Sequence, residues 1–289
     1  MTSEHRTVGF VGLGAIGRPM AESLLRAGVP VVVNDLDPAV VEQVVALGAS
    51  SAATAAELAT KTRIVGVCVP ADHHVRAVLT GPDGLLARLA PGSVVAIHST
   101  VLPETVIWAH AEAAPHGVAV VEAAVTGGAA AAAVGKSTFL LGGNPADLEK
   151  LSPLLDACGD VRVFAGELGQ ASRLKLCVNL QSYATFMGVF EAATLATRLG
   201  LSLDALRTAM RANGQLGPMV ESYLTLHDFS AEDVASPGLQ SMLSGYAAII
   251  EKDLDLILRL AADAGVPVPA AEAARTVARR VYFLEGGSK

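Results

Sequence analysis

The chain has 289 residues, a formal net charge of −7, 52% hydrophobic residues and only 4% aromatic residues. This length suffices for two globular domains, and the hydrophobic content excludes an intrinsically disordered chain. The acidic balance, without any basic run, argues against nucleic acid as a partner. Three cysteines, Cys68, Cys158 and Cys177, have no metal-like spacing, so we expect small buried thiols in a reducing cytoplasm.

The first residues of the chain bear on its expected localisation. Met1–Thr7 is polar and runs directly into a predicted strand, so we expect no signal peptide. The uncharged segment 176–190 carries several polar residues and is too short to span a membrane. The sequence therefore predicts a cytoplasmic protein without membrane contact.

The first elements form an ordered motif. A buried strand at 7–11 leads into the turn Gly12-Leu13-Gly14-Ala15-Ile16-Gly17, a helix to residue 27, and a second strand that ends at Asp35. Glycines in such a turn allow close approach of a pyrophosphate to the helix N-terminus, and the acid accepts hydrogen bonds from the ribose hydroxyls. The alternative is a chance glycine turn, but strand, helix and acid stand in the required order, which favours dinucleotide binding.

The residue pair Asp35-Leu36 also bears on the choice of cofactor. A carboxylate at this position would repel a ribose 2′-phosphate, and Leu36 supplies no cation to hold one. We therefore expect NAD, with NADP less favoured.

Short β-rich runs alternate with helical segments as far as about residue 142. The predicted strands are 63–69, 93–97, 117–121 and 138–141, and the predicted helices are 38–47, 53–59, 75–79 and 85–89. This alternation predicts an α/β domain of the Rossmann type, a doubly wound parallel sheet with helices on both faces. Ligands of such sheets bind beyond the carboxyl ends of the strands. The candidate contacts there are Val69, Pro70, Ser99, Thr100, Thr126, Gly127 and Gly128.

Polar residues near these strand ends allow other chemistry. Thr126, Gly127 and Gly128 could form either a plain turn or a nest of N–H groups and a hydroxyl that holds a carboxylate. The histidines at 73, 74 and 98 lack metal-ligand spacing, so no metal site is expected. Ser99 has no paired base, which argues against covalent catalysis.

From Gln170 onward the sequence predicts only helices. The first runs from about 170 to 199 and is apolar on all sides, so we expect it to be buried and to link two domains or two subunits. Further helices are predicted at 202–212, 218–226, 239–264 and 270–284, with a polar loop at 229–238. The predicted division is a dinucleotide-binding domain, 1–165, and an all-helical domain for substrate and oligomerisation, 166–289. Because so apolar a linking helix needs covering, a homodimer or homotetramer is expected.

Two polar residues stand at the start of this linking helix. Lys175 and Asn179 are four residues apart and share one face. A lysine here either snorkels at the helix end, or it lines a cavity or has a partner. The cluster Glu251-Lys252-Asp253 in a later apolar helix raises a similar choice between a solvated face and a site.

Taken in order, these motifs resemble those of the β-hydroxyacid dehydrogenases, a group that includes 3-hydroxyisobutyrate dehydrogenase and is related to 6-phosphogluconate dehydrogenase. The segments that carry the resemblance are 9–21, 35–36, 99–100, 122–128, 166–169, 175–179, 191–192 and 252–254, so that it covers about residues 7–285. It implies that Lys175 is the catalytic residue and that Asn179 binds substrate beside it. Thr126, Gly127 and Gly128 would bind the substrate carboxylate, and Thr100 and Lys252 would contact the cofactor.

The resemblance implies NAD-linked interconversion of a small β-hydroxy acid and its semialdehyde or keto form. One rival is an NADP-linked semialdehyde, glyoxylate or imine reductase on the same fold, although imine reductases usually lack the lysine. The other rival is a non-catalytic relative, which would be expected to have lost Lys175.

Overall fold

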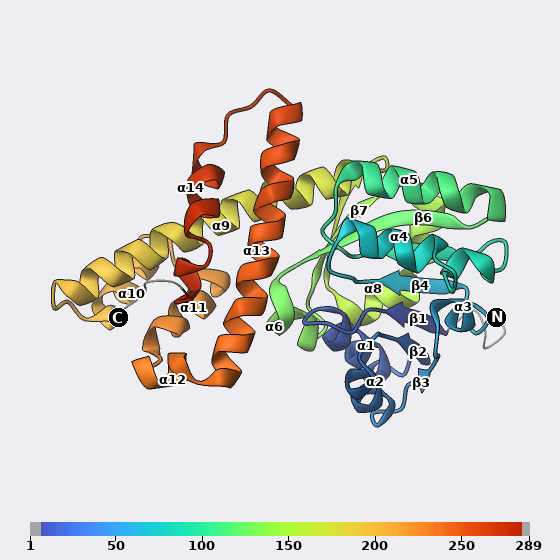
Figure 1. Cartoon of the computed structure of the whole chain (residues 1–289), viewed down its shortest axis with the longest axis horizontal. Coiled ribbons are helices and arrows are strands. Elements are labelled where there is room, and N and C mark those ends of the chain that lie inside the picture. Colours follow the sequence, from blue (N-terminus) through green and yellow to red (C-terminus); the bar gives the residue numbers. More distant parts are fainter. Residues whose placement is uncertain (1–6, 285–289) are drawn as a thin grey trace. The chain divides into compact units, whose positions relative to one another are not determined.

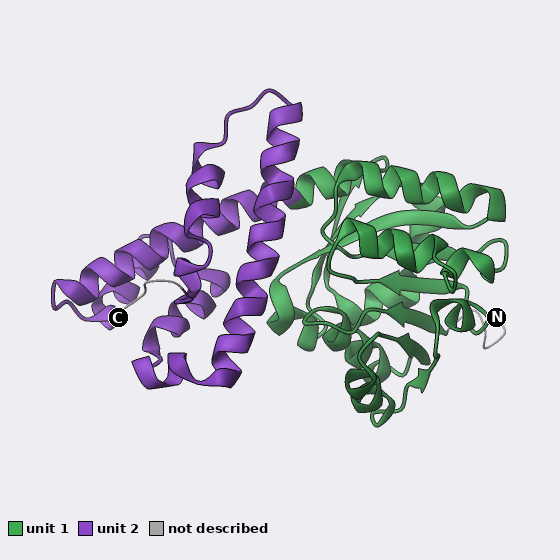
Figure 2. Ribbon diagram, in the orientation of Figure 1, with its two compact units in different colours: residues 1–175 green, residues 176–289 purple. Residues whose placement is uncertain are grey.

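A computed structural model describes residues 7–284, and it divides into two compact units, Met1–Lys175 and Leu176–Lys289 (Figure 2). The division falls inside the long helix α9, Gln170–Arg198, rather than before it at residue 165. The assignment of cofactor binding to one segment and of substrate and oligomer contacts to the other stays a prediction. The polar segment Met1–Arg6, part of the basis for expecting no signal peptide, lies outside the described residues.

The first unit is built on one eight-stranded sheet within the described part of the chain, with strand order β3-β2-β1-β4-β5-β6-β7-β8 (Figure 1). The strands are β1 (Val8–Val11), β2 (Val31–Asn34), β3 (Ser50–Ser51), β4 (Ile64–Val67), β5 (Val94–Ile97), β6 (Ala119–Thr126), β7 (Thr138–Gly142) and β8 (Val161–Gly166). The doubly wound α/β sheet predicted from the sequence is thus confirmed.

Alternate residues of β1, β2, β4, β5 and β6 enter two different hydrophobic cores. In β5, Val94 and Ala96 belong to one core, and Val95 and Ile97 to the other. Helices α1 (Gly17–Arg26), α2 (Pro38–Val45), α6 (Gly128–Ala133), α7 (Pro145–Glu149) and α8 (Ser152–Cys158) contribute to the first core. Helices α3 (Ala55–Ala59), α4 (Asp72–Thr80) and α5 (Pro103–Ala113) contribute to the second. Both faces of the sheet are therefore covered, which explains why the central strands β1, β4 and β5 are buried and apolar.

The sheet departs from the predicted all-parallel arrangement at one pair, because β7 runs antiparallel to β6. The connection between them explains this. A parallel crossover would have to travel back along the eight residues of β6, about 26 Å. The intervening helix α6 has six residues and spans only about 9 Å, so the chain turns back beside β6 instead.

The second unit is helical, as predicted. After α9 come α10 (Leu203–Ala212), α11 (Pro218–Leu224), α12 (Ala231–Ala235), α13 (Pro237–Asp263) and α14 (Pro269–Val277), with single 3₁₀ turns at Thr225–Asp228 and Arg280–Tyr282. Their inward residues, among them Leu176, Phe190 and Leu254, form one core.

The prediction of a loop over 229–238 is wrong, because this segment contains the helix α12. Ser230 Oγ accepts a hydrogen bond from Asp233 N at 3.1 Å, and the Asp233 carboxylate accepts one from Ser230 N at 2.9 Å. This capping box satisfies N–H groups at the start of the helix and allows a short polar segment to be helical.

Helix α9 is not buried on all sides in the single chain. Its buried residues fall on one stripe, which includes Ala171, Leu176, Val189 and Ala193. Leu195 on the same helix remains 60% exposed. The sequence showed how apolar the helix is, but the helices of one chain cover only one of its faces.

The thiols differ from expectation in one case. Cys158 is buried, and burial raises its pKa to about 12. Cys68 is half-buried, whereas Cys177 is exposed because it lies on the outward side of α9, two residues past Lys175. Within residues 7–284, no helix combines the length and hydropathy that crossing a membrane requires. A cytoplasmic location stays a prediction.

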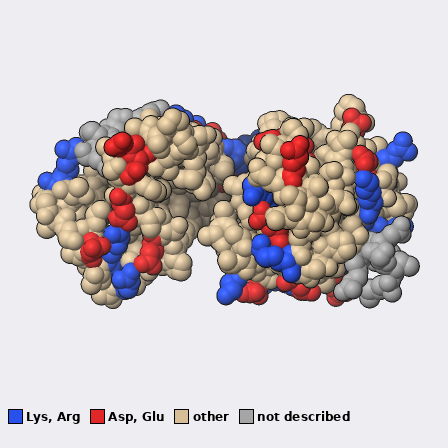
Figure 3. Space-filling view, turned by 90° about the horizontal axis from the view of Figure 1, so that it is seen from below, with Lys and Arg blue, Asp and Glu red and all other residues tan. Residues whose placement is uncertain are grey.

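Charged residues of both signs are interspersed on the face drawn in Figure 3. No continuous basic surface, of the kind that binds the phosphates of nucleic acid, is visible on that face.

Candidate active site

The glycine turn between β1 and α1 has the geometry of a phosphate cradle. Gly12 has φ +92°, and a Cβ there would overlap the Cys68 carbonyl oxygen. A Cβ on Gly17 would overlap the Gly12 carbonyl oxygen, so this glycine allows α1 to pack against the turn. A Cβ on Gly14 would meet nothing within 4 Å, so open space lies beside its backbone. Since α1 also lacks a side-chain cap at Ile16, the turn fits a dinucleotide pyrophosphate.

Asp35 is joined directly to this turn. Its Oδ2 accepts a hydrogen bond from Leu13 N at 2.6 Å, and its Oδ1 accepts one from Asp37 N at 2.8 Å. The neighbouring Leu36 is 97% exposed. The carboxylate is therefore held in place beside the glycine turn at the end of β2, where the ribose of a dinucleotide lies in this fold.

The ends of β4 and β5 lie side by side, as the parallel register requires. Val69 N donates a hydrogen bond to Ser99 Oγ at 2.8 Å, which links the Val69-Pro70 segment to Ser99-Thr100. Because β1, β4 and β5 are parallel neighbours, these segments and the glycine turn all lie at the carboxyl ends of the strands. The structure thus brings together the residues of the first unit that were predicted to contact the cofactor.

The side chain of His98, which precedes Ser99, is packed and hydrogen-bonded within the first unit. Its ring stacks on Phe10 at 5.7 Å, and Nδ1 donates to the Ala123 carbonyl at 2.7 Å. Its Nε2 has no hydrogen-bond partner within residues 7–284. Burial lowers the pKa of His98 to about 4, against a smaller raising effect of the bond to Ala123. No group of three or more potential ligands for a metal ion occurs among the residues that the structure describes.

The His98 environment predicts a pH-dependent free energy of unfolding. The unfolded ring has a pKa near 6.5 and takes up a proton before the folded one does. The contribution of His98 is complete above about pH 6.5 and is lost as the pH falls toward 4, a loss of about 1–3 kcal/mol. Urea unfolding of the wild type and of His98→Gln between pH 8 and 4 would measure it. Equal pH dependence in the two proteins would contradict this prediction.

The Thr126–Gly128 segment lies at the end of β6 and leads into α6. Glu122 of this strand pairs with Ile97, the last residue of β5, so the rest of β6 extends past that strand to Thr126. Gly127 and Gly128 have φ of +108° and +72°, conformations that favour glycine, and α6 begins at Gly128. The segment is therefore a strand-to-helix turn whose N–H groups suit an anion.

Lys175 lies in the second turn of α9 and is only 9% exposed. It belongs to the first unit with the glycine turn and Thr126, whereas Asn179, one turn further on, belongs to the second. A snorkelling lysine would keep its ammonium group in water. The low exposure of Lys175 favours the alternative, a lysine that lines a cavity or has a partner.

Asn179 belongs to a buried hydrogen-bond network in the second unit. Its Nδ2 donates to Asp253 Oδ2 at 2.7 Å, and the Tyr183 hydroxyl donates to the same oxygen at 2.6 Å. Lys252 Nζ lies 2.7 Å from Asp253 Oδ1. Burial, and then the Asp253 charge and hydrogen bond, raise the pKa of Tyr183 well above its ordinary value, so it stays a donor. With Asp253 1% exposed, the 251–253 cluster is not simply a solvated face.

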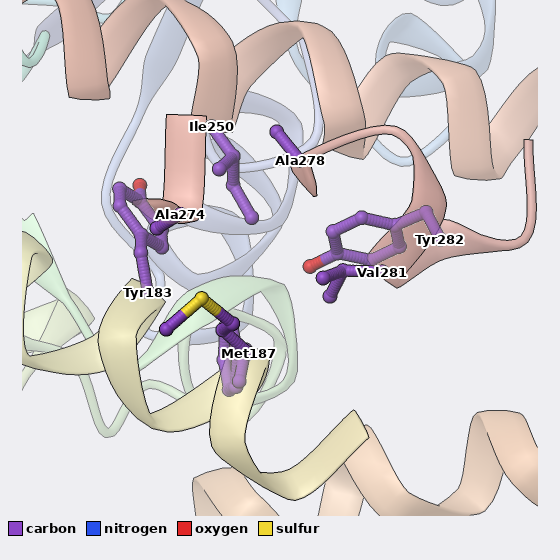
Figure 4. A pocket seen from close by; sticks show the side chains of 8 residues that line it. Tyr183, Met187, Ile250, Ala274, Ala278, Val281 and Tyr282 are labelled. Carbon is purple, nitrogen blue, oxygen red and sulfur yellow. The ribbon is translucent and has the colours of Figure 1, made fainter. Parts of the chain in front are cut away.

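The ring of Tyr183 also lines a cavity of the second unit, together with Met187 of α9, Ile250 of α13 and Ala274 of α14 (Figure 4). Its volume is about 10 Å³, enough for no more than one water molecule. This cavity is therefore not a substrate pocket.

Two carboxylates were missed as parts of this arrangement. Asp253 appeared in the sequence only as one of three adjacent charges, and Glu122 only as the acid that opens the 122–128 motif. Both are 1% exposed. For Glu122 the available signal was a lone acid within an apolar strand, because a buried carboxylate requires partners.

Comparisons with known proteins agree with this geometry. Residues 7–169 match the family model described as the NAD binding domain of 6-phosphogluconate dehydrogenase. The chain is 35% identical over 252 residues to the NAD-dependent L-serine dehydrogenase of Pseudomonas aeruginosa, covering 87% of this chain and 84% of the relative.

Two solved structures resemble nearly the whole chain. The 3-hydroxyisobutyrate dehydrogenase of Salmonella typhimurium has a TM-score of 0.82 at 28% identity, covering 97% of this chain and 95% of that one. Psf3, solved in complex with NADP⁺ and 2-OPP, has a TM-score of 0.83 at 26% identity, covering 96% and 95%. The chain therefore belongs to the β-hydroxyacid dehydrogenase family and is an oxidoreductase that acts on CH–OH groups with a nicotinamide dinucleotide.

Proposed function

We propose that this protein is an NAD-linked dehydrogenase that interconverts a small β-hydroxy acid, such as 3-hydroxyisobutyrate or L-serine, and its semialdehyde or keto form. The observation that carries the proposal is the buried Lys175 in the second turn of α9, in the same unit as the glycine turn and Asp35. The names of the similar proteins, an L-serine dehydrogenase and a 3-hydroxyisobutyrate dehydrogenase, support this substrate class.

The proposed role of Lys175 is proton transfer. In the direction of oxidation, neutral Nζ accepts the proton of the substrate hydroxyl. In the direction of reduction, the ammonium group donates a hydrogen bond to the carbonyl oxygen and then a proton. Bound nicotinamide dinucleotide supplies the hydride chemistry, and the protein orients and polarises the substrate.

Asn179 is proposed to bind the substrate hydroxyl or to orient Lys175. Its amide nitrogen donates to Asp253, which fixes the rotation of the amide and makes Oδ1 the atom available to accept. Tyr183 donates to the same carboxylate oxygen and restrains Asp253 in turn. Lys252 pairs with Asp253 and is proposed to contact the cofactor.

The Thr126–Gly128 turn is proposed to bind the substrate carboxylate. The Thr126 hydroxyl and the N–H groups at the start of α6 supply donors, and the positive end of the helix favours an anion. The positive φ of both glycines supports a turn in which successive N–H groups converge.

The substrate is tested by measuring the reduction of NAD with a panel of 3-hydroxyisobutyrate, glycerate, serine, threonate and 4-hydroxybutyrate. We expect turnover with at least one β-hydroxy acid, and little with 4-hydroxybutyrate, whose hydroxyl stands one carbon further from the carboxylate. Turnover only of imines or glyoxylate with NADPH would favour the reductase alternative. Absence of turnover in both directions would favour a non-catalytic relative.

We further expect the protein to be a homodimer or homotetramer. Large apolar side chains remain exposed at the end of α9 and beyond it, including Leu195 at 60%, Leu199 at 66% and Leu201 at 60%. Apolar side chains gathered in one stretch are typical of interfaces between subunits. Light scattering at micromolar concentration would measure the mass, and a monomer would contradict the prediction. Leu195→Glu should shift the equilibrium toward monomer, with the exposed Leu36→Glu as the control for an added charge.

A further inference from the structure

We infer that Glu122 is a positioning residue for the reaction: its carboxylate fixes the first turn of α9, and with it Lys175, relative to the Thr126–Gly128 segment. The inference rests on the role proposed above for Lys175. All of these residues lie within the first unit.

Glu122 holds the start of α9 through four hydrogen bonds. Oε2 accepts from Gly169 N at 2.6 Å and from Ala171 N at 3.3 Å. Oε1 accepts from Ser172 N at 2.8 Å and from Ser172 Oγ at 2.5 Å. The carboxylate is 1% exposed and Ser172 4% exposed, so water cannot replace these contacts without rearrangement.

The turn that precedes α9 directs its N–H groups toward this carboxylate. Gly166 and Gly169 have φ of +123° and +88°, which reverse the chain between the end of β8 and the helix. The first N–H groups of a helix have no partner within it, and a negative charge there is favourable. Glu122 therefore takes the place of an ordinary side-chain cap, although it lies 47 residues before Gly169.

The opposite strand leaves room for the carboxylate. Gly142 of β7 pairs with Glu122 across the antiparallel ladder. A Cβ on Gly142 would overlap Glu122 Oε2 and lie 3.2 Å from the Cβ of Ala171. Three segments far apart in the chain, β6, β7 and the start of α9, thus meet at one carboxylate.

This contact has a geometric consequence for the proposed site. On β6, Glu122 and Thr126 are four residues apart and face the same side of the sheet. On α9, Ser172 and Lys175 are three residues apart and share a helix face. One carboxylate therefore sets how the strand that carries Thr126 meets the first turn of the helix that carries Lys175. A displacement of about 1 Å between reacting groups can lower a rate by about 10²-fold.

Glu122→Gln tests the inference with little change in shape. A glutamine has one acceptor oxygen, and its NH₂ group would face N–H donors. We expect kcat to fall by about 10- to 100-fold, with the dissociation constant of NAD unchanged. Hydrogen exchange of the amides in segment 166–175 should accelerate, which reports the lost contacts independently of activity. Gly142→Ala, which displaces Oε2 from another strand, should have the same effects.

Thr62→Val is the matched control for a general loss of stability. The Thr62 hydroxyl is buried and donates to the Thr7 carbonyl at 2.6 Å. This contact lies just before β1 and β4, at the amino ends of the strands and thus at the end of the sheet opposite to the proposed site. This variant should lower the melting temperature as Glu122→Gln does, yet leave kcat and the exchange of segment 166–175 unchanged.

The decisive measurement is a double-mutant cycle with Lys175→Met. If Glu122 acts through Lys175, Glu122→Gln should lower kcat in the wild-type background and have no further effect in the Lys175→Met background. Equal factors in both backgrounds, or a wild-type kcat in Glu122→Gln, would overturn the inference. A wild-type kcat in Lys175→Met alone would instead overturn the proposed role of the lysine. The hydrogen exchange of segment 166–175 would then still show whether Glu122 holds the start of α9.

Discussion

Lys175→Met is expected to lower kcat by about 10²-fold or more, the usual cost of losing general acid–base catalysis. Methionine keeps an unbranched apolar side chain and a high helix propensity, so the buried second turn of α9 should persist. The amine that would exchange the proton is removed, whereas the glycine turn and Asp35 are untouched. Steady-state kinetics with a turned-over hydroxy acid, together with titration of NAD binding, would measure both consequences.

The control for this substitution is Lys150→Met. Lys150 pairs with Asp147 on an exposed part of the same unit, and its replacement should leave kcat unchanged. A Lys175→Met enzyme that retained more than about a tenth of kcat would contradict the assignment, because acid–base catalysis contributes ~10²-fold or more. Loss of NAD binding in parallel with kcat would indicate a structural role.

Asp35→Ala is expected to shift the cofactor preference by about 10²-fold, measured as the ratio of kcat/KM for NADH to that for NADPH. Two losses contribute. The acceptor for the ribose hydroxyls disappears, which weakens NADH, and the charge that would repel a 2′-phosphate disappears, which favours NADPH. The change also removes the acceptor of Leu13 N, so the glycine turn should loosen and both cofactors should lose some affinity.

Asp35→Asn separates these effects. Its amide oxygen can still accept from Leu13 N, so the turn should keep its shape while the negative charge is absent. We expect a smaller loss with NADH than in Asp35→Ala and a larger gain with NADPH, because the turn keeps its shape. Asp37→Asn is the control, because Asp37 caps α2 and asparagine caps equally well. Equal kcat/KM for NADH and NADPH in the wild-type enzyme would refute the argument from Asp35.

NADP use is the main alternative for the cofactor, since Psf3 was solved with NADP⁺ at 26% identity to this chain. The two Asp35 variants therefore test the part of the proposed function for which similar proteins differ. The class of reaction itself does not depend on the outcome.

Features that depend on residues close together in the chain could be predicted from the sequence. The glycine turn, the acid at the end of β2 and the alternation of strands with helices follow from local spacing and periodicity. So does the placement of Lys175 and Asn179 on one face of a helix, and α9 begins and ends within a residue of its predicted bounds. The resemblance to the family rested on the same local motifs.

Features that depend on distant residues could not be predicted in this way. Asn179 and Asp253 are separated by 74 residues, and Glu122 and Ser172 by 50. Nothing in the local sequence of either partner specifies the other. The antiparallel pairing of β7 similarly depends on a connection too short to cross the sheet, and the helix α12 on a reciprocal cap between Ser230 and Asp233.

The sequence by itself determined the fold class and the glycine turn, because each depends on residues within one or two turns or strands of each other, and the type of chemistry followed from the resemblance of its motifs to a known family. Only the tertiary structure decided how the segment of α9 that carries Lys175 and Asn179 is held. The buried carboxylates Glu122 and Asp253 each join elements far apart in the chain. A carboxylate removed from water must find donors, and only the folded arrangement of strands and helices brings those donors within reach.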